Sequence, residues 1–225
     1  MKNNTFRFIA ALLLSLVLPS MDAGVYVLVD LPASMAAVVA AAQQQLQKGL
    51  EEYNASHGTA FLFEPTQFSP HLSVAFVSQE PLSVQAAAAK FPAIEAVLQD
   101  IIQNNQGSID ITEAVQQAML EFWPGKFTMT FAGAPRKNFI NVVLKFAMHD
   151  TLAQQIRNGL QEHYGIKQAF PFSAHISLGR MYQQDDAPVV IQEIPAFTMP
   201  QLSEPIELNT VKLKGHDGSE VAFSL

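Results

Sequence analysis

Two short segments of the chain carry the same residue types in the same order. His71-Leu72-Ser73 and His175-Ile176-Ser177 each consist of a histidine, an apolar residue and a serine. In a β-strand alternate side chains point to one face, so each histidine shares a face with its serine while the apolar residue points into the core. If two such strands face each other, two imidazoles and two hydroxyls meet in one place.

That set of groups suits the cleavage of a phosphodiester. A neutral imidazole can take a proton from the attacking water or hydroxyl, and a protonated one can give a proton to the leaving oxygen, because the free imidazole pKa is about 6.5. Two serine hydroxyls can donate hydrogen bonds to the phosphoryl oxygens. The sequence leaves open which histidine is the acid. The alternatives are two structural strand histidines and serines bonded to nearby backbone.

The surroundings of the two motifs strengthen the prediction. FSPHLSVAF, from Phe68, and FSAHISLGR, from Phe172, share the order Phe-Ser-x-His-apolar-Ser-apolar. Rival catalytic motifs are absent from the sequence: it has no Gly-x-Ser-x-Gly elbow, no His-Glu-x-x-His and no phosphate-cradling glycine loop. His149-Asp150 resembles the metal pair of HD phosphohydrolases, but Asp150 is better explained as a helix cap.

The elements that must position the motifs recur in the same order in both halves of the chain. Each half is predicted to hold a strand, an amphipathic helix and a strand with the motif, namely 25–31, 34–53 and 68–77, then 139–146, 150–164 and 170–179. This order predicts two similar lobes related by an approximate two-fold axis. The segment 81–123 is predicted to be mostly helical, its last helix running from a cap at Asp110 to Phe122. Trp123 and Phe139 are expected in the core rather than stacked on a base.

Composition limits the class of protein. Of the 225 residues 49% are hydrophobic and 15% are charged, and this hydrophobic share is enough to form a packed core. The net charge of −7 argues against general binding of nucleic acid. The absence of Cys excludes disulfides and a cysteine nucleophile.

The N-terminus has the pattern of a secretory signal. Lys2 and Arg7 precede an apolar run, and this run is shorter than a membrane span, which needs about 20 residues, so we expect a signal peptide at 1–23. The alternatives are a retained anchor or a buried first helix.

With these residues in view, HLSVAF and HISLGR resemble the two signature motifs of the two-histidine (2H) phosphoesterase superfamily. The nearest branch is the bacterial 2′-5′ RNA ligase and cyclic phosphodiesterase group. The segment VYVLVDLP of this chain also resembles the first strand of that group. The resemblance implies an α+β, bilobed fold over 24–225, in which two antiparallel sheets face a central cleft with helices outside and 81–123 forms a helical insertion. It also implies metal-independent chemistry, without a cofactor, on 2′,3′-cyclic phosphates or 2′-5′ linkages.

By motif match, His71 and His175 are the expected catalysts, Ser73 and Ser177 the expected phosphate ligands, and Arg180 a further substrate contact or a surface ion-pairing residue. We therefore expect an exported, periplasmic or secreted phosphodiesterase. Its partner would be a small phosphodiester or short nucleotide, with no long nucleic acid and, after signal cleavage, no membrane, and the protein would be a monomer. The alternatives are a nucleotide-binding protein without turnover and a 2′-5′ RNA ligase.

Overall fold

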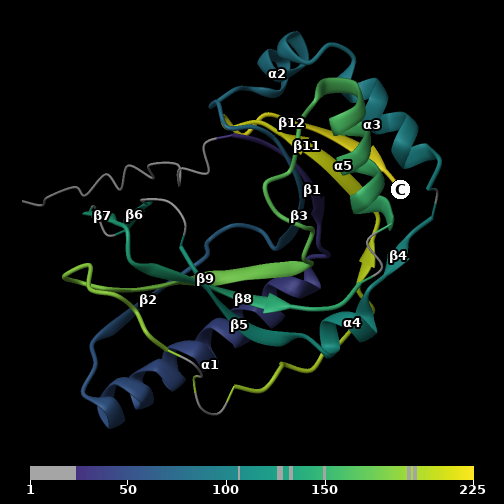
Figure 1. Ribbon diagram of the computed structural model, residues 1–225. Helices are drawn as coiled ribbons and strands as arrows, with labels where there is room; N and C mark the ends of the chain where they lie inside the picture. Colours follow the sequence, from purple (N-terminus) through teal and green to yellow (C-terminus); the bar gives the residue numbers. More distant parts are fainter. Residues whose placement is uncertain are drawn as a thin grey trace, which may run out of the picture.

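The computed structural model describes residues 24–105, 107–125, 129–131, 134–148, 151–191, 194 and 197–225 (Figure 1). The predicted signal peptide at 1–23 and the His149-Asp150 pair lie outside the described residues. No helix in the described part of the chain is long and apolar enough to cross a membrane.

Two four-stranded antiparallel sheets carry the two motifs, one on each sheet. The first sheet has the order β12 (Glu220–Ser224), β11 (Thr210–Lys214), β1 (Val25–Asp30) and β3 (His71–Ser78). The second sheet has the order β2 (Phe61–Pro65), β9 (His175–Gln183), β8 (Phe139–Lys145) and β5 (Met119–Pro124). Two small ribbons pair β4 (Ile109–Asp110) with β10 (Glu207–Leu208) and β6 (Met129–Phe131) with β7 (Ala134–Arg136). The predicted two-sheet α+β architecture is confirmed.

Each long helix packs on the sheet of the other half of the chain. Helix α1 (Ser34–His57) follows β1 of the first sheet but contacts β2 and β9 of the second, and α5 (Thr151–Tyr164) follows β8 of the second sheet but contacts β3 of the first (Figure 1). Both helices bury the apolar stripe that their sequences predict, for example Leu46 and Leu50 on α1. Side chains of both sheets and both helices form one core cluster, so the two lobes share a core.

The last helix of the middle segment is shorter than the sequence predicted. Helices α2 (Val84–Lys90) and α3 (Ile94–Gln103) form as expected, and α3 packs against α5. The predicted helix from Asp110 to Phe122 is wrong beyond α4 (Thr112–Gln116), because Met119–Pro124 is strand β5, paired along its length with β8. The predicted capping pair is not formed: the N-cap of α4 is Ile111, which makes no side-chain capping bond, and Asp110 Oδ1 accepts from the Thr112 backbone N at 2.8 Å just before the helix. Pairing with a buried strand overrides the weak local helix preference of this stretch.

The second motif strand has a neighbour that approaches unusually closely. A side chain at Gly179 would place its Cβ 2.4 Å from the backbone oxygen of Glu64 and 2.6 Å from the Phe63 ring. Both residues belong to β2, which pairs with β9 through this region. Glycine at this position therefore allows β2 to close the outer edge of β9.

We predict that Gly179→Ala lowers the free energy of unfolding by about 1–3 kcal/mol, because β2 must move to admit the methyl group. Chemical denaturation measures the loss. The control is Gly58→Asn at the end of α1, where φ is 64° and nothing lies within 4 Å of the added Cβ; since Asn tolerates this conformation, its cost should stay near about 0.5 kcal/mol. Equal losses in the two variants would contradict the assigned close approach.

Candidate active site

The two motif strands bury their side chains in the same pattern. In β3 and in β9 the histidine is half-buried, the following apolar residue is buried and the serine is exposed, and the match continues along both strands. Leu72 and Ile176 are 2% and 1% exposed, so they point into the core as strand alternation predicts. Each histidine thus lies with its serine on the face away from the core.

Each imidazole is held by the same backbone contact. Nδ1 of His71 lies 3.0 Å from the carbonyl oxygen of Ser69, and Nδ1 of His175 lies 2.7 Å from that of Ser173. A carbonyl can only accept, so Nδ1 of each ring carries the hydrogen and the neutral ring keeps its free lone pair on Nε2. The two rings therefore present the same nitrogen for proton transfer.

The structure brings the two histidines close enough to sense each other's charge. Strands β3 and β9 are in contact across the two sheets. Burial lowers the pKa of His175; the hydrogen bond to Ser173 opposes that effect, and the positive charge of a protonated His71 adds to it. The strands that carry the two motifs therefore pack against each other.

The strand beside each histidine carries a charged residue next to that histidine. This residue is acidic in the first sheet and basic in the second. Asp30 on β1 is directly opposite His71, and Lys145 on β8 is directly opposite His175. Each is held in an ion pair by the next strand: Asp30 Oδ2 lies 2.7 Å from Lys212 Nζ, and Lys145 Nζ lies 2.9 Å from Glu121 Oε1. The sequence alone could not say which way Lys145 points; the register places it on the His175 face.

Trp123 is a site residue that sequence reasoning missed. Its ring makes an edge contact with the His175 ring, with centroids 4.6 Å apart, and its Nε1 donates to Glu121 Oε2 at 2.7 Å. The expectation of a core position is wrong for Trp123, which is half-buried, and confirmed for Phe139, which is buried against Tyr182. The alternation of Glu121 and Trp123 would have identified a shared face, had the segment been recognised as a strand.

Arg180 lies on the same face as His175 and Ser177, although strict alternation from His175 would place it on the other one. The β8–β9 register shifts between Val142 and Val143, so Ser177 is opposite Val143 while Arg180 is opposite Asn141. This shift is a β-bulge, which reverses the alternation. The other cross-strand neighbour of Arg180 is Glu64 on β2.

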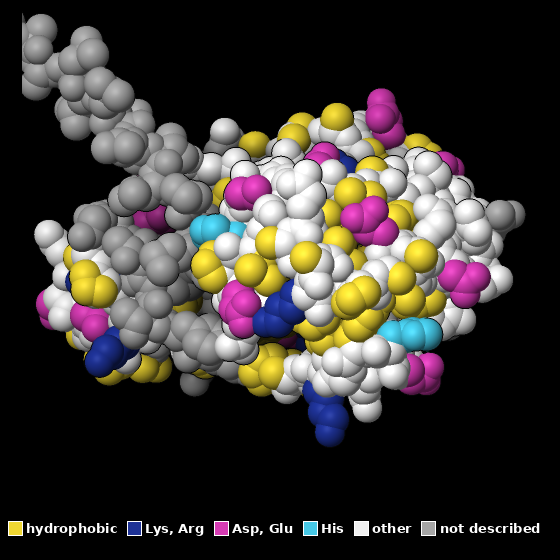
Figure 2. All heavy atoms as spheres, turned by 90° about the horizontal axis from the view of Figure 1, so that it is seen from above, with side chains coloured by type: hydrophobic (Ala, Val, Ile, Leu, Met, Phe, Trp, Pro, Cys, Tyr) yellow, Lys and Arg dark blue, Asp and Glu magenta, His cyan; other side chains and the backbone are white. Residues whose placement is uncertain are grey.

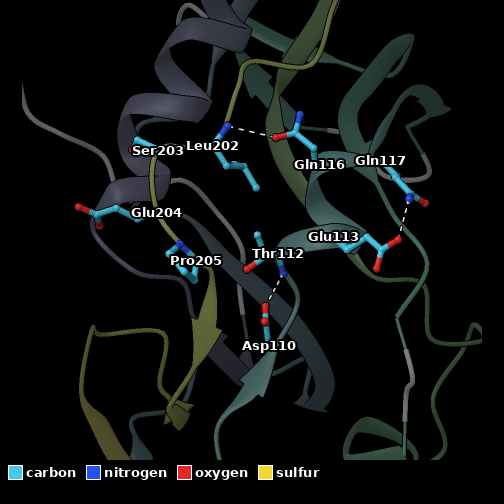
Figure 3. A pocket seen from close by; sticks show the side chains of 9 residues that line it. All are labelled: Asp110, Thr112, Glu113, Gln116, Gln117, Leu202, Ser203, Glu204 and Pro205. Carbon is cyan, nitrogen blue, oxygen red and sulfur yellow. Dashed lines mark hydrogen bonds between the residues drawn. The ribbon is translucent and has the colours of Figure 1, made fainter.

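A surface pocket in the described part of the chain lies elsewhere and has the wrong charge for a phosphate. Figure 3 shows it between α4 and the segment 202–205, with Asp110, Glu113 and Glu204 among its lining residues and no Lys, Arg or His. Gln116 in its wall is occupied as the acceptor for the Leu202 backbone N. Among the described residues no group of three or more His, Asp or Glu is arranged to hold a metal ion.

Comparisons with known proteins agree with this geometry at the level of the fold. No family model and no curated protein matches the sequence. The structure of Usb1 from Kluyveromyces marxianus is similar with a TM-score of 0.52 at 11% identity, covering 89% of this chain and 97% of that chain. The same protein with uridine monophosphate gives a TM-score of 0.50, also at 11% identity and with the same coverage. The chain therefore shares its fold with Usb1.

A structure of E. coli LigT complexed with 3′-AMP is also similar, with a TM-score of 0.43, 16% identity, and coverage of 90% of this chain and 94% of that chain. In the present chain Trp123 and Lys145 lie beside His175, and Asp30 lies beside His71.

We predict that Trp123→Ala raises the pKa of His175 toward its ordinary value, because burial is the main cause of the lowering and the indole supplies part of that burial. Titration of the His175 ring protons by NMR measures the change. Trp123→Phe keeps an aromatic ring in place and should retain most of the lowering. An unchanged His175 titration in the alanine variant would show that the indole does not shield the imidazole.

Proposed function

We propose that this chain is a metal-independent phosphodiesterase that hydrolyses 2′,3′-cyclic phosphates or 2′-5′ linked nucleotides by paired-histidine acid–base catalysis, and that it acts after export directed by residues 1–23. The observation that carries the proposal is the matched pair of imidazoles, each with Nδ1 bound to a backbone carbonyl and Nε2 left for proton transfer. The fold shared with Usb1 and the resemblance of both motifs support the same chemistry.

The lowered pKa of His175 favours its role as the base. Burial and the neighbouring His71 both disfavour the protonated form of His175. We assign His175 to remove the proton from the attacking water. The proton for the leaving ribose oxygen then falls to His71, the other imidazole of the pair.

The two histidines account for every proton that is transferred in one turnover of a cyclic phosphate. Nε2 of His175 takes a proton from water as the water oxygen bonds to phosphorus, and His71 gives a proton to the ribose oxygen as its bond to phosphorus breaks. Ser73 and Ser177, both exposed on the histidine face, are proposed to donate to the non-bridging oxygens, where negative charge develops. The guanidinium of Arg180 is proposed to contact the phosphate or a residue of the neighbouring lobe.

The face of the molecule shown in Figure 2 favours a small substrate over a long one. On the face shown in Figure 2, Lys and Arg side chains are separated from one another and interspersed with Asp and Glu. Extended nucleic acid is held by a continuous set of phosphate contacts, which such a distribution does not offer. A short nucleotide needs only the local groups around the two histidines.

We predict that His71→Ala and His175→Ala each reduce kcat by about 10²–10⁴-fold on nucleoside 2′,3′-cyclic phosphates or 2′-5′ dinucleotides, because each removes one proton-transfer group. Purified protein is assayed with a chelator present, and circular dichroism checks the fold. The control is His57→Ala at the exposed end of α1, which should leave turnover unchanged. Wild-type rates in both motif variants would eliminate the mechanism, and tight binding without product would favour a binding protein instead.

The pH dependence of kcat/KM should identify the two roles. A neutral base and a protonated acid predict a bell: activity rises as His175 loses its proton and falls at higher pH as His71 does. The pH profile of the residual activity of His175→Ala should lack the rise on the acid side. The profile of His71→Ala should lack the fall on the alkaline side. The opposite pattern of losses would exchange the two roles, and a single-limbed wild-type profile would contradict the pair.

A further inference from the structure

The β-bulges that interrupt the two motif strands lie at equivalent places. In β3, Ser73 pairs with Leu28 and Ala75 with Val27, so Val74 has no partner on β1. In β9, Ser177 pairs with Val143 and Gly179 with Val142, so Leu178 has no partner on β8. Val74 and Leu178 are the bulge residues. Each directly follows the serine of its motif.

One helix side chain binds the carbonyl of each bulge residue. Arg157 on α5 donates from Nε to the Val74 oxygen at 3.0 Å, and Gln43 on α1 donates from Nε2 to the Leu178 oxygen at 2.8 Å. Both side chains are half-buried. Because the helices are exchanged between the lobes, each donor comes from the half of the chain that holds the other motif.

The same two side chains also hold the segments that lead into the histidines, 66–70 before His71 and 170–174 before His175, which we term the approach segments. Gln43 Nε2 donates to the Thr66 oxygen at 3.0 Å, and Arg157 Nη2 donates to the Phe170 oxygen at 3.0 Å. Thr66 and Phe170 are at equivalent positions, counted back from their histidines. The Arg157 guanidinium also lies 5.6 Å from the centre of the Phe172 ring.

The approach segments contain the carbonyls that orient the imidazoles. Ser69 and Ser173, whose oxygens bind Nδ1 of His71 and His175, lie within them. Gln43 thus connects the bulge of the second motif to the segment that orients His71. Arg157 connects the bulge of the first motif to the segment that orients His175.

We propose that Gln43 and Arg157 are a reciprocal pair of positioning residues that fix the orientation and relative placement of the two histidines. The catalytic part of this inference rests on the proposed phosphodiesterase function. Neither side chain needs to touch the substrate: each acts through the backbone of both motifs. The two perform the same task with different chemistry, a neutral amide on one side and a guanidinium on the other.

The test uses the full chain with two variants that remove the donors at similar volume, Gln43→Leu and Arg157→Met. The first readout is the tautomer of each ring, taken from imidazole ¹⁵N shifts at a pH where the rings are neutral. We expect a crossed pattern: Gln43→Leu mixes the tautomers of His71 and leaves His175 on Nδ1–H, and Arg157→Met does the reverse. A purely structural role would not produce this selectivity.

The second readout is turnover of a nucleoside 2′,3′-cyclic phosphate. We expect each variant to lower kcat by about 10–100-fold with little change in KM, because misplacement of a proton donor or acceptor acts on the transition state more than on binding. Arg157→Lys offers one nitrogen in place of two and should recover part of the loss; it also serves if Arg157→Met does not fold. Gln45→Leu is the matched control on α1, since Gln45 accepts from the Thr198 backbone N, away from both motifs.

Two outcomes would overturn the proposal: wild-type tautomers in both donor variants with kcat per folded molecule unchanged, or equal tautomer mixing at both histidines in each variant. If the wild-type protein has no phosphodiesterase activity, the proposed function fails by itself. The crossed tautomer pattern then still decides whether Gln43 and Arg157 position the rings.

Discussion

An extra residue after the serine of each motif interrupts the strand pairing, and much of the surrounding structure depends on how that interruption is satisfied. A bulge leaves backbone groups without a ladder partner, and an unsatisfied buried carbonyl costs about 1–3 kcal/mol. The Val74 oxygen is bound by Arg157, and the Leu178 oxygen by Gln43 and by the Thr66 backbone N at 2.9 Å. In return the bulge changes the alternation of β9, so that Arg180 shares the face of His175 and Ser177.

The approximate symmetry of the two lobes is kept in the backbone and broken in the charges. Asp30, tied to Lys212, lies beside one histidine, and Lys145, tied to Glu121, lies beside the other. Such partly exposed ion pairs contribute only about 0–1 kcal/mol each to stability. What differs between the two lobes is the order of the charges: an acidic residue lies directly beside His71 with its basic partner one strand further, and a basic residue lies directly beside His175 with its acidic partner one strand further.

The sequence predicted the parts of this site that depend on local periodicity. Alternation placed His71 with Ser73 and His175 with Ser177, and both pairs lie together on the exposed side of their strands. Periodicity failed where a non-local contact decides. Strict alternation cannot anticipate a bulge, so it misplaces Arg180. Trp123 belongs to a strand only because β8 is available to pair with β5, and a stretch containing Leu120 and Glu121 carries no local signal strong enough to reveal it.

The exchange of helices between lobes explains why the placement of the two histidines is a property of the whole core. Helix α1 contacts β9, and α5 contacts β3, so each motif strand packs against a long helix from the other half of the chain. Strand β2 completes the outer edge of β9, with Glu64 opposite Arg180. At the equivalent position of the other half, the Gln168 side chain takes the place of a strand: its Oε1 accepts from the Phe76 N at 2.8 Å and its Nε2 donates to the Phe76 oxygen at 2.9 Å. Both motif strands are therefore closed by residues that lead into the other motif, and a displacement of one histidine must disturb contacts that hold the other.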